Sequence, residues 1–142
     1  DMPLKVYKGT DGKTRKHVNG IELAFFLDLN RDLIRGSVIE EVGAGPNDGK
    51  VSAFKFGMNT GIVHGAIAAH LIPIMTVRPG VWKLNLGLTS DKKLSLQKAK
   101  VLFPEHHSKF LRAKDDGRAE AALLAKYGER IFTPIPKEKA LI

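Results

Sequence analysis

Apolar and polar positions alternate along the chain with two different periods, and the change of period predicts which segments are strands and which are helices. Leu4 and Val6 alternate with polar residues before a glycine-containing turn, which predicts a hairpin. Asn19 and Glu22 form a capping pair ahead of an apolar stripe, which predicts a helix start. The predicted elements are a hairpin at 3–18, a helix at 19–31, a buried strand at 33–42, a loop at 43–51, a helix at 52–71, a strand at 73–77, a short helix or turn at 81–87, and helices at 92–103 and 115–127.

Strands that alternate with helices are typical of a layered α/β domain. A length of 142 residues suits one domain. We expect this domain to span residues 1–132 and a short tail to follow at 133–142, where two prolines interrupt regular structure. Within the helix 52–71, Gly57, Gly61 and Gly65 are four residues apart and share one face. We expect that face to pack closely on a neighbouring element, and we favour this over contact with a ligand.

The charge of the chain is strongly basic and unevenly distributed. The sequence holds 23 Lys and Arg against 15 Asp and Glu, a net charge of +8, and residues 78–118 alone hold ten Lys and Arg against four acids. Such a surplus favours an anionic polymer as partner, nucleic acid first, because neutralised phosphates release counterions. A solvated basic surface without a partner is the competing interpretation.

Other features of the composition exclude several classes of function. The absence of cysteine excludes a disulfide framework, a thiolate zinc site and a cysteine nucleophile, and it fits a reducing, cytoplasmic location. No apolar run approaches the length of a membrane span, so we expect no membrane partner. No Gly-rich loop precedes a Lys-Ser or Lys-Thr pair, so we expect no nucleotide cofactor.

Two carboxylates interrupt the predicted strand 33–42. Glu40 and Glu41 lie in the apolar run Val38–Val42, and a carboxylate in a buried strand is costly unless it is paired or binds a cation. Because successive residues of a strand face opposite sides, only one of the two can share a site with acids elsewhere. A salt bridge at the end of the strand is the competing interpretation.

A second group of acids opens the last predicted helix. Asp116 and Glu120 are four residues apart, so both carboxylates lie on one helix face, which alanines and leucines mark as inward-facing. Like charges at this spacing repel, and a divalent cation between them would turn the repulsion into binding. For Asp115 we favour a role at the helix N-terminus, where a negative charge stabilises the helix dipole.

A strand carboxylate that faces two helix carboxylates would form a cluster of hard oxygen ligands. Mg²⁺ and Mn²⁺ prefer such ligands and complete their coordination with substrate phosphate oxygens. Two such ions can activate water and stabilise the leaving oxygen in phosphodiester cleavage. A carboxylate cluster in a basic chain therefore suggests a nuclease more than a passive nucleic-acid-binding protein.

The ordered motifs together resemble RuvC-type Holliday junction resolvases of the RNase H-like superfamily, and the small bacteriophage and prophage versions most of all. The likeness covers nearly all of residues 1–130. It rests on Val38-Ile-Glu-Glu-Val42, Phe54-Lys-Phe-Gly57, Arg78-Pro-x-x-Trp82-Lys83-x-x-Leu86-Gly87, Asp91-Lys92, Leu102-Phe-Pro104 and Asp115-Asp-Gly-Arg-Ala-Glu-Ala121.

This resemblance implies a mixed β-sheet flanked by helices, a homodimer, and Mg²⁺-dependent cleavage of four-way DNA junctions by paired nicks, in recombination, repair or phage DNA processing. It implies that Glu40 rather than Glu41 is the metal ligand of the strand, and that Asp116 and Glu120 complete the catalytic site.

The sequence departs from the family in two ways. The helix acids are usually three apart, whereas Asp116 and Glu120 are four apart, so Asp115 is a possible replacement ligand. The family's first strand carries an Asp in an Ile-x-Asp-x-Gly context, and nothing in this sequence matches it. We therefore expect the domain to lack its first two strands here, and a missing upstream segment to explain why the chain begins at Asp1. Without that segment the domain would lack one metal ligand of the family and should bind metal poorly.

Several basic and aromatic residues are candidates for DNA contacts. The predicted phosphate-binding residues flank the two carboxylate groups along the sequence. Phe54 and Phe56 resemble the position where resolvases insert an aromatic wedge into the junction, and core packing is their competing interpretation. We expect Trp82 to be a packing anchor rather than a platform for base stacking. The predicted phosphate-binding residues are Lys50, Lys55, Lys83, Lys92, Lys93 and Arg118.

Three functions remain open at this point. The first is the metal-dependent junction endonuclease, and the second is a catalytically inactive homodimer that binds branched DNA, as the missing first strand would make it. The third is an RNase H-like protein that acts on RNA or on another branched substrate, because a fold does not determine its substrate.

Overall fold

The computed structural model describes residues 1–43 and 45–132, and the chain divides into two compact units. The first unit comprises Asp1–Ile34 and Val42–Ile74, and the second comprises Arg35–Glu41 and Met75–Ile142, described as far as residue 132. The predicted tail at 133–142 lies outside the described residues, as does residue 44 of the predicted loop.

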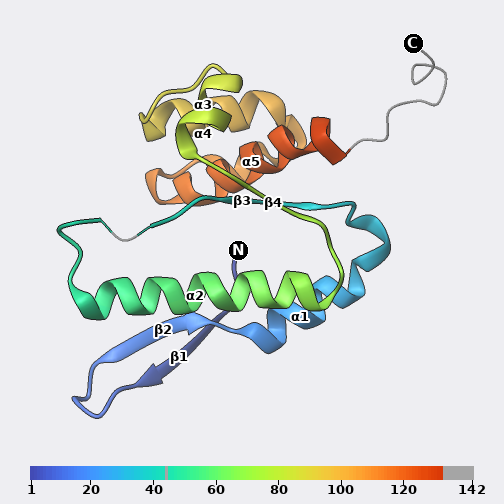
Figure 1. Cartoon of the computed structure of the whole chain (residues 1–142). Coiled ribbons are helices and arrows are strands. Elements are labelled where there is room, and N and C mark those ends of the chain that lie inside the picture. Colours follow the sequence, from blue (N-terminus) through green and yellow to red (C-terminus); the bar gives the residue numbers. More distant parts are fainter. Residues whose placement is uncertain (44, 133–142) are drawn as a thin grey trace. The chain divides into compact units, whose positions relative to one another are not determined.

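The first unit begins with the predicted hairpin. Strands β1 (Leu4–Lys8) and β2 (Thr14–Val18) pair antiparallel, with Leu4 opposite Val18 and Lys8 opposite Thr14. Gly12 occupies the turn with φ +73°, a conformation that glycine adopts without strain. The hairpin leads into helix α1 (Gly20–Leu29), and the Asn19 side chain accepts a hydrogen bond from the Glu22 backbone N–H at 3.3 Å. The predicted hairpin (Figure 1) is therefore confirmed, and so is the predicted helix cap.

Helix α2 (Lys50–Ala69) completes the first unit. The Val18 backbone N–H donates to Asn59 Oδ1 at 2.9 Å and so joins the hairpin to α2. At the other end of α2, the Arg31 guanidinium donates to the carbonyls of His70 and Leu71 at 2.9 and 3.3 Å, where the last turn leaves carbonyls without partners.

The prediction that the glycines of α2 pack closely on a neighbour is wrong. A Cβ added at Gly57, Gly61 or Gly65 would meet no atom within 4 Å in the described structure. The regular spacing places these residues on one face, but the spacing alone does not say whether another element covers it.

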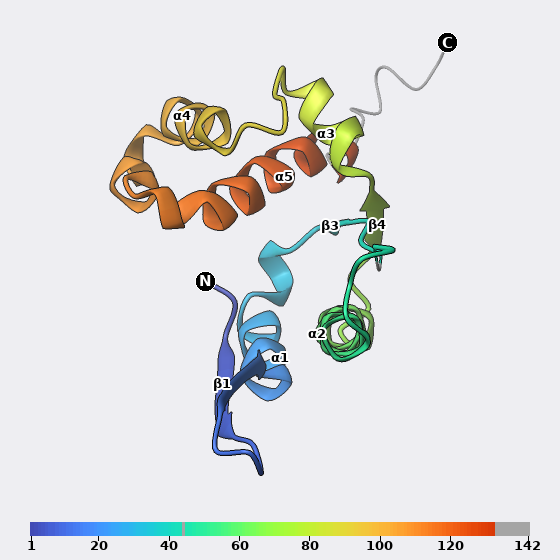
Figure 2. The same cartoon turned by 90° about the vertical axis from the view of Figure 1, so that its left-hand side faces the viewer.

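The second unit pairs β3 (Ser37–Glu40) with β4 (Ile74–Val77) and adds helices α3 (Pro79–Asn85), α4 (Lys92–Leu102) and α5 (Asp116–Phe132). Short 3₁₀ segments at Pro104–Phe110 and Ala113–Asp115 connect α4 to α5, and α4 lies alongside α5 (Figure 2). The strand is shorter than the predicted 33–42: residue 33 belongs to a 3₁₀ turn at Arg31–Leu33, and the ladder covers only Ser37–Glu40.

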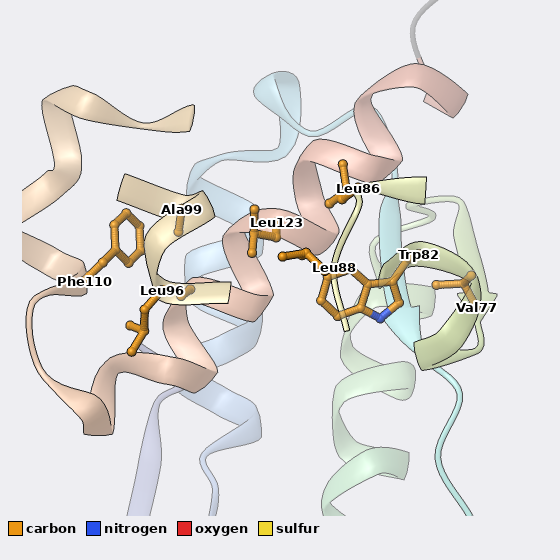
Figure 3. Packing of buried hydrophobic residues seen from close by; sticks show 9 residues of the cluster. Val77, Trp82, Leu86, Leu88, Leu96, Ala99, Phe110 and Leu123 are labelled. Carbon is orange, nitrogen blue, oxygen red and sulfur yellow. The ribbon is translucent and has the colours of Figure 1, made fainter. Parts of the chain in front are cut away.

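The main hydrophobic core lies in the second unit (Figure 3). Trp82 from α3 and Leu123 from α5 are fully buried, and Ala119 lies one turn before Leu123 on the same face. The side chains of α3, α4 and α5 meet in this core, which therefore fixes the positions of the helices that carry the predicted site residues. The buried members of the cluster are Val77, Trp82, Leu86, Leu88, Leu96, Ala99, Phe110, Ala119 and Leu123.

The architecture is a mixed α/β fold, mostly helical, with small sheets, as predicted at that level. Within residues 1–43 and 45–132, the strands form two separate two-stranded sheets rather than one sheet, so the RNase H-like arrangement stays a prediction. None of the described helices combines the length and the apolar character that crossing a lipid bilayer requires.

Candidate functional site

Close packing of α5 on β3 sets the position of the strand carboxylates. A Cβ at Gly128 would lie 2.4 Å from Val38 Cγ2, and a Cβ at Gly36 would lie 2.4 Å from the Phe132 ring. Only glycine permits this approach at either position. The two pairs show that β3 and α5 run in opposite directions, since the strand number rises as the helix number falls. Glu40 therefore lies toward the N-terminal half of α5.

The pleat of β3 decides which of the two glutamates faces α5. Val38 and Glu40 are two residues apart and so point to the same side of the strand, toward the helix. Glu41 points the other way: its side chain accepts from Arg78 Nε at 3.2 Å in an exposed ion pair. The predicted salt bridge at the strand end is thus made by Glu41, and Glu40 is the carboxylate on the helix side.

A buried indole holds Glu40. Trp82 Nε1 donates to Glu40 Oε2 at 2.9 Å, and the Glu40 side chain is half-buried. Pro79 in the first turn of α3 starts this short helix one turn before Trp82, because its fixed φ suits that position. Within the described structure, no hydrogen bond engages Glu40 Oε1.

The next residue of α3 holds Glu120. Lys83 Nζ donates to Glu120 Oε1 at 2.7 Å, and the hydroxyl of Ser95 from α4 approaches the same oxygen at 3.4 Å. The ion pair is partly shielded, since the side chains of Lys83 and Glu120 are 16% and 25% exposed. Lys83 Nζ also lies 5.3 Å from the centre of the Trp82 ring, within the range of a cation–π interaction.

Asp116, the first residue of α5, pairs with Lys92 at the start of α4. The Lys92 ammonium holds the pKa of the Asp116 carboxyl below its ordinary value, and the carboxylate in turn raises the pKa of Lys92. The start of α4 is fixed by Asp91, whose Oδ1 accepts from the Lys93 backbone N–H at 2.8 Å.

Asp115 supports the fold, in keeping with the helix-terminus role favoured from the sequence. Its side chain is 3% exposed, and both of its oxygens accept hydrogen bonds from Arg112: Oδ1 from Nη2 at 2.8 Å, and Oδ2 from the backbone N–H at 2.9 Å. These bonds lower the pKa of Asp115 to about 2. With both oxygens occupied, Asp115 anchors the turn before α5 and is a poor replacement ligand.

Glu40, Asp116 and Glu120 all belong to the second unit, but they do not form a ready metal centre. Among residues 1–43 and 45–132, no three His, Cys, Asp or Glu side chains are arranged to hold a metal ion. The reason is visible in their partners, since Lys92 and Lys83 neutralise the two helix carboxylates. The donor chemistry nevertheless suits Mg²⁺, which prefers carboxylate oxygens.

The other predicted DNA contacts divide between the units. Lys50 and Lys55 lie on α2 in the first unit, while Lys93 is exposed on α4. Arg118 on α5 donates to the Lys109 carbonyl at 2.9 Å and lies 3.6 Å from Asp115 Oδ1. Arg118 therefore stabilises the turn before α5, and it is also a candidate phosphate contact.

The predicted wedge residues are exposed. Phe54 is 74% exposed and Phe56 is 48% exposed, both in the first turns of α2. The competing interpretation, that they pack in a core, is wrong for the described structure. Their role as a wedge stays a prediction.

Sequence reasoning missed two polar contacts of this site. It treated Trp82 only as a packing or stacking residue, whereas its N–H contacts Glu40. It did not consider Ser95, which is fully buried between leucines on α4. A serine on the inner face of an amphipathic helix is a signal that a polar partner lies opposite, because a buried hydroxyl needs one.

An apolar hollow of about 510 Å³ lies elsewhere in the second unit, between α5 and the segment after α4. Phe103, Phe110 and Ala122 line it, and none of the predicted site residues does. The carboxylates are therefore a separate feature.

No family model matches the sequence, and no curated protein matches it.

Proposed function

We propose that this chain is a metal-dependent, structure-specific endonuclease of the RuvC type that cuts four-way DNA junctions. The observation that carries the proposal is that consecutive residues of α3 bind the two carboxylates: Trp82 donates to Glu40 at 2.9 Å, and Lys83 donates to Glu120 at 2.7 Å. Carboxylates held by neighbouring residues of one helix, in a basic protein, suit cleavage of a polyanion.

Glu40, Glu120 and Asp116 are the residues that would hold Mg²⁺ or Mn²⁺. When bound, such an ion activates water and stabilises the leaving oxygen of a phosphodiester. Lys83 and Lys92 lie beside these carboxylates and supply positive charge for the phosphate of the strand to be cut. The first-unit lysines, Lys50 and Lys55, would hold the duplex by its backbone without reading its sequence.

Cleavage of a synthetic four-way junction tests the proposal. We expect paired nicks in Mg²⁺, and a loss of about 100-fold or more in Glu40→Gln and Glu120→Gln, because even the residues that support metal ligands cost about 10–100-fold when removed. Glu41→Gln is the matched control: it removes the adjacent carboxylate, which faces away from α5, and should retain cleavage. Equal loss in Glu41→Gln and Glu40→Gln would contradict the assignment.

A second candidate is an inactive homodimer that binds branched DNA. The observation that favours it is the neutralisation of both helix carboxylates by lysines. Junction binding that persists in chelator, with no nicking from this chain or from an N-terminally extended version where the gene encodes one, would favour this candidate. Sedimentation of the protein with and without junction DNA tests the homodimer. Faster cutting of a linear duplex or an RNA hybrid would point to a different substrate.

A further inference from the structure

Trp82 combines complete burial with a polar contact at the candidate site. It is the sole tryptophan of the chain, and its side chain is fully enclosed by the core of the second unit (Figure 3). Its indole N–H nevertheless leaves the apolar cluster and donates to Glu40 Oε2 at 2.9 Å. A buried indole N–H needs an acceptor, and here the acceptor is the carboxylate of Glu40.

The physical consequence is that a rigid group orients a flexible one. A glutamate side chain has three rotatable bonds, and a half-buried one samples several positions unless something holds it. An indole packed on all sides cannot follow such motion, and its N–H bond to a carboxylate is charge-assisted and therefore strong. The contact thus selects one carboxylate oxygen, Oε2, and leaves Oε1 without a hydrogen bond in the described structure.

We propose that Trp82 is a positioning residue for Glu40: it fixes the carboxylate through Oε2 so that Oε1 is presented to a divalent cation. This inference rests on the proposed function, since it concerns the cation that the endonuclease would use. Trp82 itself contacts neither the cation nor the DNA in this proposal.

The neighbouring residue strengthens the argument. Lys83 engages Glu120 through one oxygen, Oε1, just as Trp82 engages Glu40. Lys83 neutralises Glu120, whereas no Lys or Arg of the described residues forms an ion pair with Glu40, so its carboxylate is left to attract a cation. Because Trp82 and Lys83 belong to one short helix, the two carboxylates are held relative to each other by α3 rather than independently.

The first test measures binding of the cation alone, with no DNA. Mn²⁺ and, separately, Mg²⁺ are titrated into the full chain while the emission of Trp82 is recorded. We expect a saturable change in emission, with quenching by paramagnetic Mn²⁺, because the indole adjoins the carboxylate that binds the ion. Glu40→Gln keeps the tryptophan and should lose the change, whereas Glu41→Gln should keep it.

The second test removes the N–H bond. Trp82→Phe retains an aromatic ring in the core but has no donor, and we expect Mn²⁺ affinity measured by calorimetry to fall about 10–100-fold. Phe110→Leu is the matched control, because it disturbs the same core cluster at a residue that lies away from Trp82 (Figure 3), and it should leave Mn²⁺ affinity unchanged. Circular dichroism checks that each variant is folded. If Trp82→Phe does not fold, the emission titration still tests cation binding, because it uses the unmodified chain.

The outcomes separate this inference from the proposed function. Equal Mn²⁺ affinity in Trp82→Phe and the unmodified chain, or no Mn²⁺ binding by the unmodified chain, would overturn the positioning role. Mn²⁺ binding that depends on both Trp82 and Glu40, in a protein that never nicks junctions, would support the positioning role and refute the endonuclease. If the unmodified chain nicks junctions and Trp82→Phe binds Mn²⁺ as tightly as the unmodified chain, the endonuclease would be supported and the positioning role refuted.

Discussion

The two units of this protein handle their apolar residues differently. In the second unit, α5 buries Ala119 and Leu123 on one face, and that face accounts for its packing. In the first unit, α1 buries Leu23 and Leu27, but a second apolar stripe on the same helix is exposed. Its members are Ile21, Phe25 and Leu29, spaced four apart.

This difference teaches that an apolar helix face identifies a core only when the opposite face is polar. Helices α4 and α5 are amphipathic, and their buried residues follow the apolar stripe. In helices α1 and α2 the polar residues are not gathered on one face, so their sequence does not say which face packs within the unit. Exposed apolar stripes are typical of surfaces that contact a partner, and the predicted homodimer remains a prediction.

The largest expected effect compares the same truncation in the two units. Leu123→Ala removes a fully buried side chain from α5 and should lower the free energy of unfolding by about 2–5 kcal/mol. Leu29→Ala removes an identical side chain that is 68% exposed on α1, and should change stability by less than about 0.5 kcal/mol. Urea unfolding of both variants measures the difference. Losses of similar size would mean that the stripe on α1 is covered in solution.

The next largest effect compares a glycine-to-alanine substitution in a helix of each unit. Gly61→Ala on α2 adds a methyl group into open space and should stabilise the protein by about 1 kcal/mol, the usual helix preference of alanine. Gly128→Ala on α5 places the methyl group against Val38. Overpacking of this kind costs about 1–3 kcal/mol and should outweigh that preference.

The two glycine variants should therefore shift the urea midpoint in opposite directions. An equal rise in stability for both would contradict the close packing of α5 on β3, on which the position of Glu40 depends.

The smallest expected effect concerns how the free energy of unfolding changes at acid pH. Because Arg112 lowers the folded-state pKa of Asp115 to about 2, this carboxylate stabilises the fold above its unfolded pKa of about 4. The contribution is lost as the pH falls through about 2. Asp115→Asn should therefore reduce the free energy of unfolding at neutral pH and converge with the unmodified protein near pH 2.

A matched pair in the first unit provides the control. Asp11 pairs with Arg15, and this bond also lowers the pKa of Asp11, but the Asp11 side chain is 43% exposed. Solvent screens such a pair, so Asp11→Asn should change the pH dependence less than Asp115→Asn does. Urea titrations at several pH values compare the two, and a larger effect in Asp11→Asn would refute the structural role given to Asp115.

Most local elements could be predicted from the sequence because their signals are local. The hairpin, the cap at Asn19 and the helices with one polar face follow from residues only a few positions apart. The predicted strand at 33–42 is shorter in the structure, and just before it Arg31 holds the end of α2, a contact between distant positions that no local pattern predicts. Whether a face is covered, as for the glycines of α2, depends on the same kind of distant contact.

In the candidate site, too, features set by nearby residues could be predicted and contacts between distant residues could not. The helix acids Asp116 and Glu120 follow from their spacing, and the side of Glu40 follows from the strand pleat once α5 is known to pack on Val38. The lysine partners of the helix acids could not be predicted, because these ion pairs join residues 37 and 24 positions apart. They form through the tertiary packing of α3 and α4 on α5, which no local pattern encodes.

The adjacency of Trp82 and Lys83 has an evolutionary consequence. Each residue added to or removed from α3 ahead of Trp82 would turn both side chains by about 100° around the helix axis. A single insertion or deletion would then detach Glu40 and Glu120 together, whereas a point substitution affects one of them. Descendants of this protein should tolerate changes of residue type along this helix far more readily than changes in its length.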